Sequence, residues 1–487
     1  MVDYDLVVIG GTPAGIYAAI EATYLKARVA LVASPLLGST WSESFTKYSK
    51  ALNQVARVAH QMRRAKAFGV HLELDEKIVL PKVEVQFSDA IKWAKGSVAA
   101  LDEQHSPAVL AALGVDVIFG TGEFCRRPYL GFVVNEQILR SRTYLIATGS
   151  RPMIPEIDGL QSAGYLTPDT IWHQANIKLP KTLIIIGGDP QAIELAQTFT
   201  RFGSSVTLIV STPQILPKED PEANLLIQAQ LEAEGVRVMT DCRVTQVKWI
   251  QDKKWIQAGD RAIEADEILV AIGQQPHVDN LNLEGVKVEV DERGIRVNPK
   301  LQTTNSRIYA CGDVLGGYRF AQLANYEARI ALKNMLFLPW VKVDYRHISW
   351  AIFSDPELAR VGLTEEQARR RYGDDVMVLR RYFKGVDKAQ MRGETTGFCK
   401  ILVLKNGEII GAHLVGPEAS ELIDAIALAM QQGMKVSAIA HLPTIFPTLG
   451  DINSQTASDW SQQRLNQNLS KQNFLESFFN IRRSWSG

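Results

Sequence analysis

The sequence predicts an α/β protein with doubly wound parallel sheets, and two similar stretches of the chain carry this prediction. Residues 6–9 form a short apolar run with β-branched side chains, and a turn at Gly10 stops it before a stretch that favours helix. Residues 183–186 repeat this order, with Gly187 and Gly188 after the run. A buried strand, a glycine turn and a helix open a βαβ unit. At 487 residues the chain is also too long for one core, so we expect about two to four domains.

Composition and charge argue against several classes of function. Lys+Arg and Asp+Glu both number 53, so the net charge is zero and no global field favours nucleic acid or an acidic substrate. No apolar run is long enough to span a bilayer, and the opening stretch has no signal-peptide cleavage site. The four cysteines have no paired spacing, which indicates a reducing cytoplasm and neither a disulfide scaffold nor a metal site. They are Cys125, Cys242, Cys311 and Cys399.

The first strand, turn and helix carry the pattern G-x-T-x-x-G, close to the G-x-G-x-x-G of dinucleotide-binding loops. Gly10 makes the tight turn, Gly15 lets the helix pack on the strand, and Thr12 stands at the second glycine. The helix from Pro13 onward would direct its free N–H groups and the positive end of its dipole at a pyrophosphate. We therefore expect Gly10, Thr12, Pro13, Ala14 and Gly15 to bind a dinucleotide.

The second strand of each unit lacks the acid that usually binds the ribose hydroxyls of a dinucleotide. In the first unit this strand is residues 29–33, and Ser34 follows it. In the second unit it is residues 206–210, and Val210 takes the place of the acid. For the first unit two interpretations stay open: Ser34 and other groups hold the ribose, or nucleotide binding has weakened.

Residues 38–52 read G-S-T-W-S-E-S-F-T-K-Y-S-K-A-L. They resemble the segment G-G-T-C-x-x-x-x-C-x-x-S-K-x-L of the pyridine nucleotide-disulfide oxidoreductases, which include dihydrolipoamide dehydrogenase, glutathione reductase, mercuric reductase and soluble transhydrogenase. Trp41 and Thr46 replace both redox cysteines of that segment. Because thiol–disulfide exchange requires a thiolate, we expect this site to lack it. The matching residues are Gly38, Thr40, Ser49, Lys50 and Leu52.

Three further motifs resemble the same family in the same order. Residues 147–152 read A-T-G-S-R-P, a strand end that brings backbone close to the flavin in the family. Residues 268–276 resemble the return strand into the flavin domain. Residues 307–314 read R-I-Y-A-C-G-D-V, where Asp313 would accept hydrogen bonds from the flavin ribityl chain; the alternative is an aspartate that only shapes a turn. The resemblance implies FAD as cofactor, bound in part by Ser34, Thr40, Lys50, Ala147, Thr148, Gly149, Gly312, Asp313 and Ala321.

The resemblance also implies that the second strand, turn and helix bind NAD(P)H. Asp189 stands where the second glycine would let the backbone approach the pyrophosphate, and it adds bulk and a like charge. Glu194 matches a family glutamate that pairs with the lysine corresponding to Lys50 beside the flavin N5. The alternative is a retained Rossmann domain that binds NAD(P)H poorly or not at all. The residues expected at this second site are Gly187, Gly188, Glu194 and Gly273.

Residues 352–365 resemble the start of the family's C-terminal interface domain, which in relatives forms the dimer and supplies a catalytic His-Pro-Thr from the partner subunit. Counted on from Glu421 without a gap, this segment reads Phe446-Pro447-Thr448, so Phe446 replaces the histidine. The acid that holds the histidine corresponds to Asp451. His441 would fit only after a shift of register. We expect a homodimer without this acid–base group.

The chain continues beyond the usual end of the family with a polar stretch, residues 461–471, that we interpret as a linker. An amphipathic helix is expected after it, with Arg482 and Arg483 beside its apolar face. Such a helix can lie on a membrane surface. It can equally dock on its own domain, and we favour docking. The apolar face comprises Phe474, Leu475, Phe478, Ile481 and Trp485.

The full fold expectation is two doubly wound Rossmann-like nucleotide domains, for FAD and NAD(P), plus a C-terminal α+β interface domain. The expected limits are 1–152 and 276–343 for FAD, 153–275 for NAD(P), 344–460 for the interface domain and 461–487 for the tail.

The leading hypothesis for function is a cytoplasmic FAD-dependent oxidoreductase that passes electrons from NAD(P)H to a small acceptor such as a quinone, without a redox disulfide. Lys50 and Glu194 would be its catalytic residues, and Trp41 and Phe446 would line the acceptor side. One alternative is a flavoprotein with weak or lost NAD(P)H binding that serves as a binding or assembly partner. The other is a transhydrogenase-like enzyme.

Overall fold

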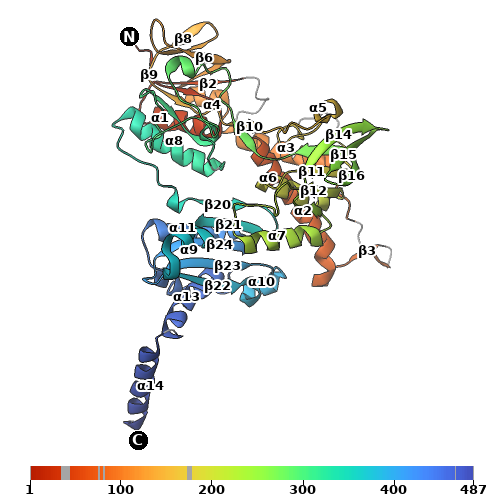
Figure 1. Cartoon of the computed structure of the whole chain (residues 1–487), viewed down its shortest axis with the longest axis vertical. Helices are drawn as coiled ribbons and strands as arrows, with labels where there is room; N and C mark the ends of the chain where they lie inside the picture. Colours follow the sequence, from red (N-terminus) through yellow and green to blue (C-terminus); the bar gives the residue numbers. More distant parts are fainter. Residues whose placement is uncertain are drawn as a thin grey trace. The chain divides into compact units, whose positions relative to one another are not determined.

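The computed structural model describes residues 2–34, 44–74, 77–79, 83–172, 178–317, 319–466 and 468–485. The chain forms two compact units (Figure 1). The first comprises Met1–Pro213 and Glu234–Asp344, and the second comprises Gln214–Ala233 and Tyr345–Gly487. The domain limits expected from the sequence stay predictions.

A five-stranded parallel sheet in the order β19-β9-β1-β2-β5 forms the first nucleotide fold of unit 1. Its strands are apolar on both faces because helices and loops cover both, as in doubly wound sheets. Helix α1 connects β1 to β2 and packs against α8. The bounds are β1 Tyr4–Ile9, α1 Pro13–Tyr24, β2 Val29–Ala33, β5 Val115–Phe119, β9 Ser141–Ile146, β19 Ile308–Ala310 and α8 Ala321–Leu336.

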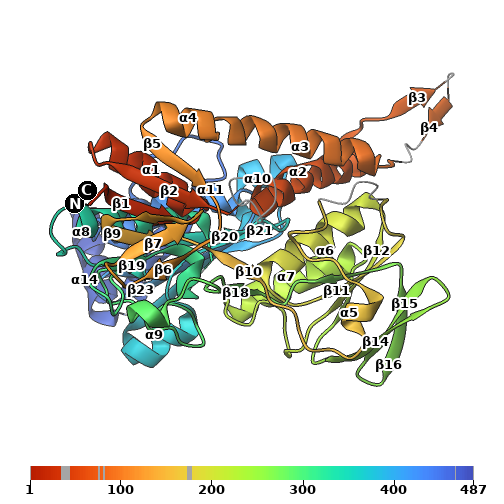
Figure 2. The ribbon, with the colours of Figure 1, turned by 90° about the horizontal axis from the view of Figure 1, so that it is seen from above.

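Two long helices follow β2 in the chain, and the first of them reaches the second nucleotide fold. Helix α2 packs against α3 and also against α6. Figure 2 shows α2 and α3 side by side, with the hairpin β3–β4 at one end of the pair. An antiparallel sheet β6-β7-β8 completes the first fold. The bounds are α2 Ser44–Arg64, η1 Ala65–Phe68, β3 Leu72–Leu74, β4 Lys77–Val79, α3 Phe87–Glu103, α4 Pro107–Ala112, β6 Gly122–Cys125, β7 Gly131–Val134 and β8 Gln137–Leu139.

The second nucleotide fold is a four-stranded parallel sheet in the order β13-β12-β11-β17, with an antiparallel sheet β14-β15-β16 beside it. The short strands β10 and β18 pair antiparallel where the chain leaves the first fold and returns to it. The bounds are β10 Ser150–Pro152, α5 Leu160–Ala163, β11 Thr182–Ile186, α6 Pro190–Phe202, β12 Ser205–Ile209, β13 Arg237–Met239, β14 Val244–Ile250, β15 Lys253–Ala258, β16 Arg261–Ala265, β17 Glu267–Val270, β18 Gln274–Pro276, η2 Glu284–Val286 and η3 Gly312–Leu315.

Unit 2 is built on a five-stranded antiparallel sheet in the order β20-β21-β24-β23-β22, with helices packed around an apolar core. Helix α7 belongs to this unit, although it lies between β12 and β13 in the sequence. The bounds are α7 Pro221–Ala233, η4 Tyr345–His347, β20 Ser349–Ile352, β21 Glu357–Gly362, α9 Glu365–Tyr372, η5 Gly373–Asp375, β22 Val376–Tyr382, η6 Phe383–Gly385, α10 Asp387–Arg392, β23 Phe398–Leu404, β24 Ile409–Gly416, α11 Ala419–Gln431, α12 Val436–Ala440, α13 Asp451–Asn466 and α14 Leu469–Ser484.

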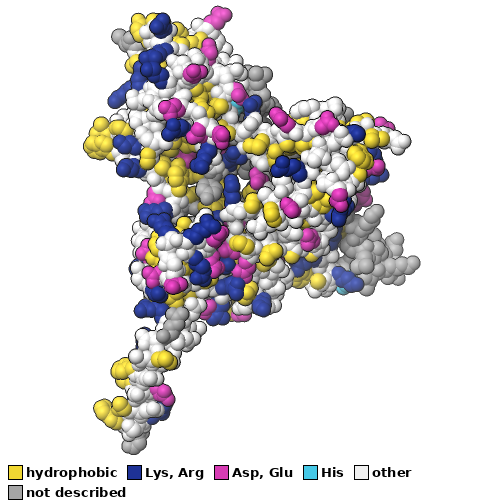
Figure 3. Space-filling view, viewed as in Figure 1, with side chains coloured by type: hydrophobic (Ala, Val, Ile, Leu, Met, Phe, Trp, Pro, Cys, Tyr) yellow, Lys and Arg dark blue, Asp and Glu magenta, His cyan; other side chains and the backbone are white. Residues whose placement is uncertain are grey.

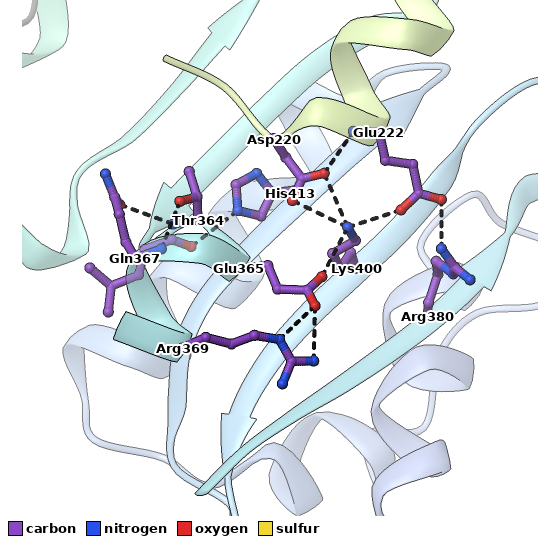
Figure 4. A network of polar contacts seen from close by, with 10 residues as sticks. Asp220, Glu222, Thr364, Glu365, Gln367, Arg369, Arg380, Lys400 and His413 are labelled. Carbon is purple, nitrogen blue, oxygen red and sulfur yellow. Dashed lines mark hydrogen bonds and ion pairs between the residues drawn. The ribbon is translucent and has the colours of Figure 1, made fainter. Parts of the chain in front are cut away.

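A buried ionic cluster holds the start of α7 against the sheet of unit 2 (Figure 4). The Lys400 ammonium on β23 pairs with Asp220 at 3.0 Å, Glu222 at 2.9 Å and Glu365 at 3.4 Å. Lys400 and Asp220 have side chains only 5% and 2% exposed. Buried charges are tolerated only when they are paired, so this cluster fixes where α7 lies.

A second group of side chains continues the cluster on β21 and β24. The Arg360 guanidinium stacks on the Trp350 ring at 4.7 Å and pairs with Glu219 at 3.3 Å. His413 is fully buried, and its Nε2 lies 3.1 Å from the Leu363 carbonyl oxygen. Burial, with the Arg360 charge, lowers the pKa of His413 to about 4, so this ring is neutral at neutral pH.

The C-terminal helix α14 forms as the sequence predicts, but none of its residues is buried. Its exposed side chains include Phe474 and Trp485, which are 66% and 86% exposed. Figure 3 shows hydrophobic side chains at the surface of this helix. The expectation that its apolar face docks on its own domain was therefore wrong: the helix continues from α13 without folding back on the sheet.

We expect Lys400→Ala to lower the free energy of unfolding by about 3–5 kcal/mol, because it leaves Asp220 buried without its cation. Urea unfolding of the full chain, followed by tryptophan fluorescence, measures this change. Lys405→Ala is the matched control, since Lys405 pairs with Asp375 where both side chains are more than half exposed. It should cost less than about 1 kcal/mol. Equal effects of the two substitutions would contradict the role given to the cluster.

Candidate functional site

The first glycine loop is shaped by a close approach of two backbone segments at the ends of β1 and β9. Gly10 has φ +119°, and a Cβ added there would lie 2.1 Å from the Ala147 carbonyl oxygen. A Cβ added at Gly15 would lie 2.0 Å from the Gly10 carbonyl oxygen. No side chain fits at either position, so the loop presents bare backbone above the start of α1, as a bound pyrophosphate requires.

Thr12, at the place of the second glycine, caps α1. Its Oγ1 accepts a hydrogen bond from the Gly15 N–H at 3.4 Å and donates one to the Ala147 carbonyl at 2.8 Å. The threonine thereby ties the loop to the end of β9. Pro13 is the first residue of α1, and Ala14 behind it is buried.

Three segments far apart in the sequence meet at the expected flavin site. Ser150 donates a hydrogen bond from its Oγ to Asp313 Oδ2 at 2.8 Å. A Cβ added at Gly149, which has φ +73°, would lie 3.0 Å from the Thr12 methyl group. Thr148 donates its hydroxyl hydrogen bond to the His277 carbonyl at 2.6 Å. Thr12, Gly149 and Asp313 therefore lie around one site, as their motifs predict.

Asp313 is a largely buried carboxylate in the short helix η3. Burial raises its pKa, while the Ser150 hydrogen bond and the Arg319 charge oppose this effect. The Gly312 N–H donates to Glu327 at 2.7 Å, which fixes the turn before Asp313. Ala321 begins α8, whose first turn has neither a capping side chain nor an acid, so the positive end of its helix dipole is not offset there. These features fit a flavin nucleotide.

The second glycine loop repeats the geometry of the first. Gly187 has φ +139°, and a Cβ added there would lie 2.0 Å from the Ala271 carbonyl oxygen. Gly188 follows it in the turn, and Asp189 is the N-cap residue of α6, although its side chain makes no capping hydrogen bond. Gly273 has φ +123° at the end of the return strand. The sequence-predicted residues of this loop are thus brought together.

Lys50 and Glu194 form an ion pair between the two nucleotide folds. Lys50 lies on α2 and Glu194 on α6, and Lys50 Nζ lies 2.5 Å from Glu194 Oε2. Glu194 is nearly buried, with 6% of its side chain exposed, while Lys50 is 31% exposed. Thr46 lies one turn before Lys50 on α2. Gly38, Thr40 and Trp41 lie outside the described residues, and Ser34 directly follows β2 in a half-buried position.

All four cysteines fall in the described part of the chain, and each is a free thiol. Burial raises the pKa of Cys399 to about 12 and that of Cys311 well above its ordinary value. Neither buried thiol is therefore suited to form a thiolate at neutral pH.

The segment that we expect to correspond to the family's His-Pro-Thr is exposed in this chain. Phe446 is 70% exposed. The Asp451 carboxylate accepts a hydrogen bond from the Thr444 hydroxyl at 2.7 Å and one from the Thr448 N–H at 3.4 Å. His441 ends α12 and is exposed. The Asp451 carboxylate, which we expected to correspond to the family's acid, is thus satisfied by hydroxyl and backbone donors.

Sequence reasoning missed Ser150, Glu327 and Arg319 at the site. Ser150 lies inside the 147–152 motif, so the motif itself could have indicated it. Glu327 is a buried acid on the apolar face of α8, which helical periodicity could have found. Arg319 follows no local pattern, and only the fold places it near Asp313 and Asp189.

Across the described ranges, no group of three or more His, Cys, Asp or Glu side chains could hold a metal ion. Within the same part of the chain, no helix is long and apolar enough to cross a membrane.

Comparison with known proteins relates these features to one family. Residues 4–328 match the family model described as pyridine nucleotide-disulphide oxidoreductase, and residues 348–456 match its dimerisation domain. Mercuric reductase of Staphylococcus aureus is 32% identical over 442 residues, which cover 89% of this chain and 78% of that protein. Dihydrolipoyl dehydrogenase of Bacillus subtilis (strain 168) is 32% identical over 451 residues, which cover 92% and 96%.

A solved structure shows the same fold. The Cu(II) complex of the HOCl-induced flavoprotein disulfide reductase RclA from Escherichia coli matches with a TM-score of 0.82 at 25% identity, over 94% of this chain and 99% of that one. These matches confirm the predicted fold class, with nucleotide-binding folds and a C-terminal dimerisation domain. They also confirm FAD as the cofactor, in a family that uses NAD(P)H. The chain belongs to the pyridine nucleotide-disulphide oxidoreductase family.

Proposed function

We propose that this protein is an FAD-dependent oxidoreductase that passes electrons from NAD(P)H to a small acceptor without an active-site disulfide. The observation that carries this proposal is the Lys50–Glu194 ion pair at 2.5 Å, one turn beyond Thr46 on α2. The family's lysine and glutamate are retained, while Thr46 stands where the family has its second cysteine. A thiolate relay is therefore missing at a site whose polar pair is intact.

The different burial of Lys50 and Glu194 suggests a different role for each residue. Glu194, on α6, is the more buried partner, and it holds the Lys50 ammonium of the neighbouring helix α2 in one direction. A fixed cation favours negative charge that develops beside it during electron transfer. When bound, FAD supplies the hydride and electron chemistry itself. Lys50 would act by contact with the cofactor, and Glu194 would act through Lys50.

A quinone is the acceptor that we propose. Trp41 and Phe446 put aromatic side chains at the positions where the family has a cysteine and the histidine. Flat aromatic rings stack well against a quinone ring. Phe446 is 70% exposed, and its neighbour Ile445 is 80% exposed. An apolar segment of this kind in a dimerisation domain is best covered by a second copy, so we also propose a homodimer. The free thiols support a reducing, cytoplasmic location.

Two other functions remain as alternatives to this proposal. Asp189 in the second glycine loop and Val210 at the end of its second strand favour a flavoprotein with weak NAD(P)H binding that serves as a binding partner. A transhydrogenase-like enzyme would need good ribose sites in both nucleotide folds, and neither fold has the usual acid there.

We further propose that α14 brings the protein to an anionic membrane surface, where a lipid-soluble quinone would be available. None of its residues is buried, and Phe478 and Ile481 are 45% and 55% exposed. Lys471, Arg482 and Arg483 outnumber the single acid of the helix, Glu476. An apolar face with basic residues beside it favours binding in the plane of an anionic membrane surface.

An anaerobic titration of the purified protein with NADH and with NADPH tests the proposed function. We expect reduction to take up two electrons per flavin rather than four, with no thiolate-to-flavin charge-transfer band and no turnover of disulfide substrates. Glu194→Gln should slow flavin reduction while FAD stays bound. Glu267→Gln, in an ion pair with Lys254 of the same unit, is the control and should leave the rate unchanged. An uptake of four electrons would contradict the proposal, as would robust disulfide reduction.

Asp313→Ala should weaken FAD binding by at least about tenfold, or ~1.4 kcal/mol, because it removes the proposed ribityl acceptor that Ser150 holds in place. The flavin-to-protein absorbance ratio and the Kd on reconstitution measure the effect. Asp260→Ala changes a side chain that is 96% exposed and should retain full flavin. Unchanged FAD affinity in Asp313→Ala would show that this carboxylate only shapes the turn.

The full chain should sediment with vesicles that contain an anionic phospholipid and stay in solution with neutral vesicles. Phe478→Glu should abolish sedimentation, because it places a charge on the apolar face of α14. Asn480→Glu adds the same charge to the polar face, beside Glu476, and should reduce sedimentation far less. A blue shift of Trp485 fluorescence should accompany binding. Equal losses in both variants would indicate charge attraction alone and contradict insertion of the apolar face.

A further inference from the structure

Asp189 occupies a capping position without capping its helix. It precedes α6 with φ −79° and ψ 164°, the extended conformation of an N-cap residue, yet its carboxylate accepts no capping hydrogen bond. The carboxylate is directed toward Gly273, since Asp189 Oδ2 lies 3.0 Å from the point where a Cβ of Gly273 would be. The side chain that was expected to obstruct a pyrophosphate therefore leaves the first N–H groups of α6 uncapped.

Arg319 lies at the same point of the structure. Its Nη1 lies 3.7 Å from the Cβ position of Gly273, beside the Asp189 carboxylate. Its Nε is buried and has no hydrogen-bond partner among the described residues. Burial lowers the pKa of Arg319, and the charges of Asp313 and Asp189 oppose that effect. The guanidinium thus lies within the electrostatic reach of one carboxylate from each nucleotide fold.

The two glycine loops carry different residues at the position of the second glycine, Thr12 in the first loop and Asp189 in the second. In the first loop Thr12 is neutral, and its hydroxyl joins the end of β9. In the second loop Asp189 is charged, and a pyrophosphate at α6 would meet a like charge. A cation that holds the carboxylate away from the helix removes this conflict. Gly273 provides the space, because a side chain there would collide with the carboxylate and φ +123° disfavours one.

We propose that Arg319 is a positioning residue for NAD(P)H: its guanidinium offsets the charge of Asp189 and holds that carboxylate beside Gly273, so that the N-terminus of α6 stays open for the nucleotide pyrophosphate. The inference rests on the proposed function in taking NAD(P)H as the ligand of the second loop. It adds a residue from the first nucleotide fold to the binding site of the second.

A double-mutant cycle on Arg319 and Asp189 tests this inference. The variants are Arg319→Gln, Asp189→Asn and the double substitution, with Arg293→Gln as the control for loss of one exposed arginine of the same unit. The Kd values of NAD⁺ and NADP⁺ are measured by calorimetry on the FAD-loaded protein. These oxidised nucleotides report binding without flavin reduction. The flavin content of each variant is measured in parallel.

We expect Arg319→Gln to weaken nucleotide binding by at least about tenfold, because Asp189 is then left uncompensated. Asp189→Asn should not weaken binding. In the Asp189→Asn background, Arg319→Gln should raise the nucleotide Kd by less than about threefold. The effects of the two substitutions are then strongly coupled. Arg293→Gln should leave the Kd unchanged, and all variants should retain FAD.

Other outcomes would overturn the inference. Additive effects would mean that Arg319 acts independently of Asp189. Loss of FAD from Arg319→Gln would assign the arginine to Asp313 and the flavin site. Absence of nucleotide binding in the wild type would overturn it as well. If the cycle shows coupling but NADH and NADPH do not reduce the flavin, the inference stands and the proposed electron donor is wrong. If both nucleotides reduce the flavin but the effects are additive, only the inference fails.

Discussion

The glycine loops of both nucleotide folds depend on one steric constraint, the contact of a glycine with the carbonyl oxygen at the end of a neighbouring strand. Gly10 lies against the Ala147 carbonyl, and Gly187 lies in the same way against the Ala271 carbonyl. Added Cβ atoms would lie 2.1 and 2.0 Å from these oxygens. Because both glycines have positive φ, no other residue type fits without strain. The loop, the start of the following helix and the return strand are therefore fixed relative to one another, and the polar side chains are arranged around them.

This constraint explains which parts of the fold and the site could be predicted from the sequence. A strand, a glycine turn and a helix are local, so Gly10, Gly15 and Gly187 are recognisable by spacing alone. Asp313 was recognisable because its motif is contiguous. The position of α7 was not, since it depends on Lys400 pairing with Asp220, and those two residues are 180 positions apart in the chain. Periodicity correctly predicted that α14 is a helix, but it could not tell which surface covers the apolar face.

The Lys50–Glu194 ion pair depends on the packing of the fold and not on the residues that carry a relative's chemistry. Lys50 and Glu194 come from different nucleotide folds, so their contact depends on α2 packing against α6. The ion pair itself involves no atom of Thr46, which lies one turn away on α2. Likewise, the Asp451 carboxylate accepts its hydrogen bonds from Thr444 and Thr448 and not from a histidine. If Thr46 and Phe446 stand in place of a cysteine and the histidine, as we propose, the scaffold does not depend on those groups, and fold alone does not fix function.

Charge is the remaining link between the two nucleotide folds. Arg319 lies in the segment between η3 and α8 of the first fold, close to Asp313, and its guanidinium also reaches the neighbourhood of Asp189 in the second. The half-buried guanidinium interacts with both carboxylates, so a change in the charge or hydrogen bonding of one carboxylate alters the field at the other. A ligand that donates hydrogen bonds to Asp313 would leave more of the guanidinium's field for Asp189. Flavin loading and nucleotide binding would then be coupled through one side chain, and by linkage the coupling acts equally in both directions.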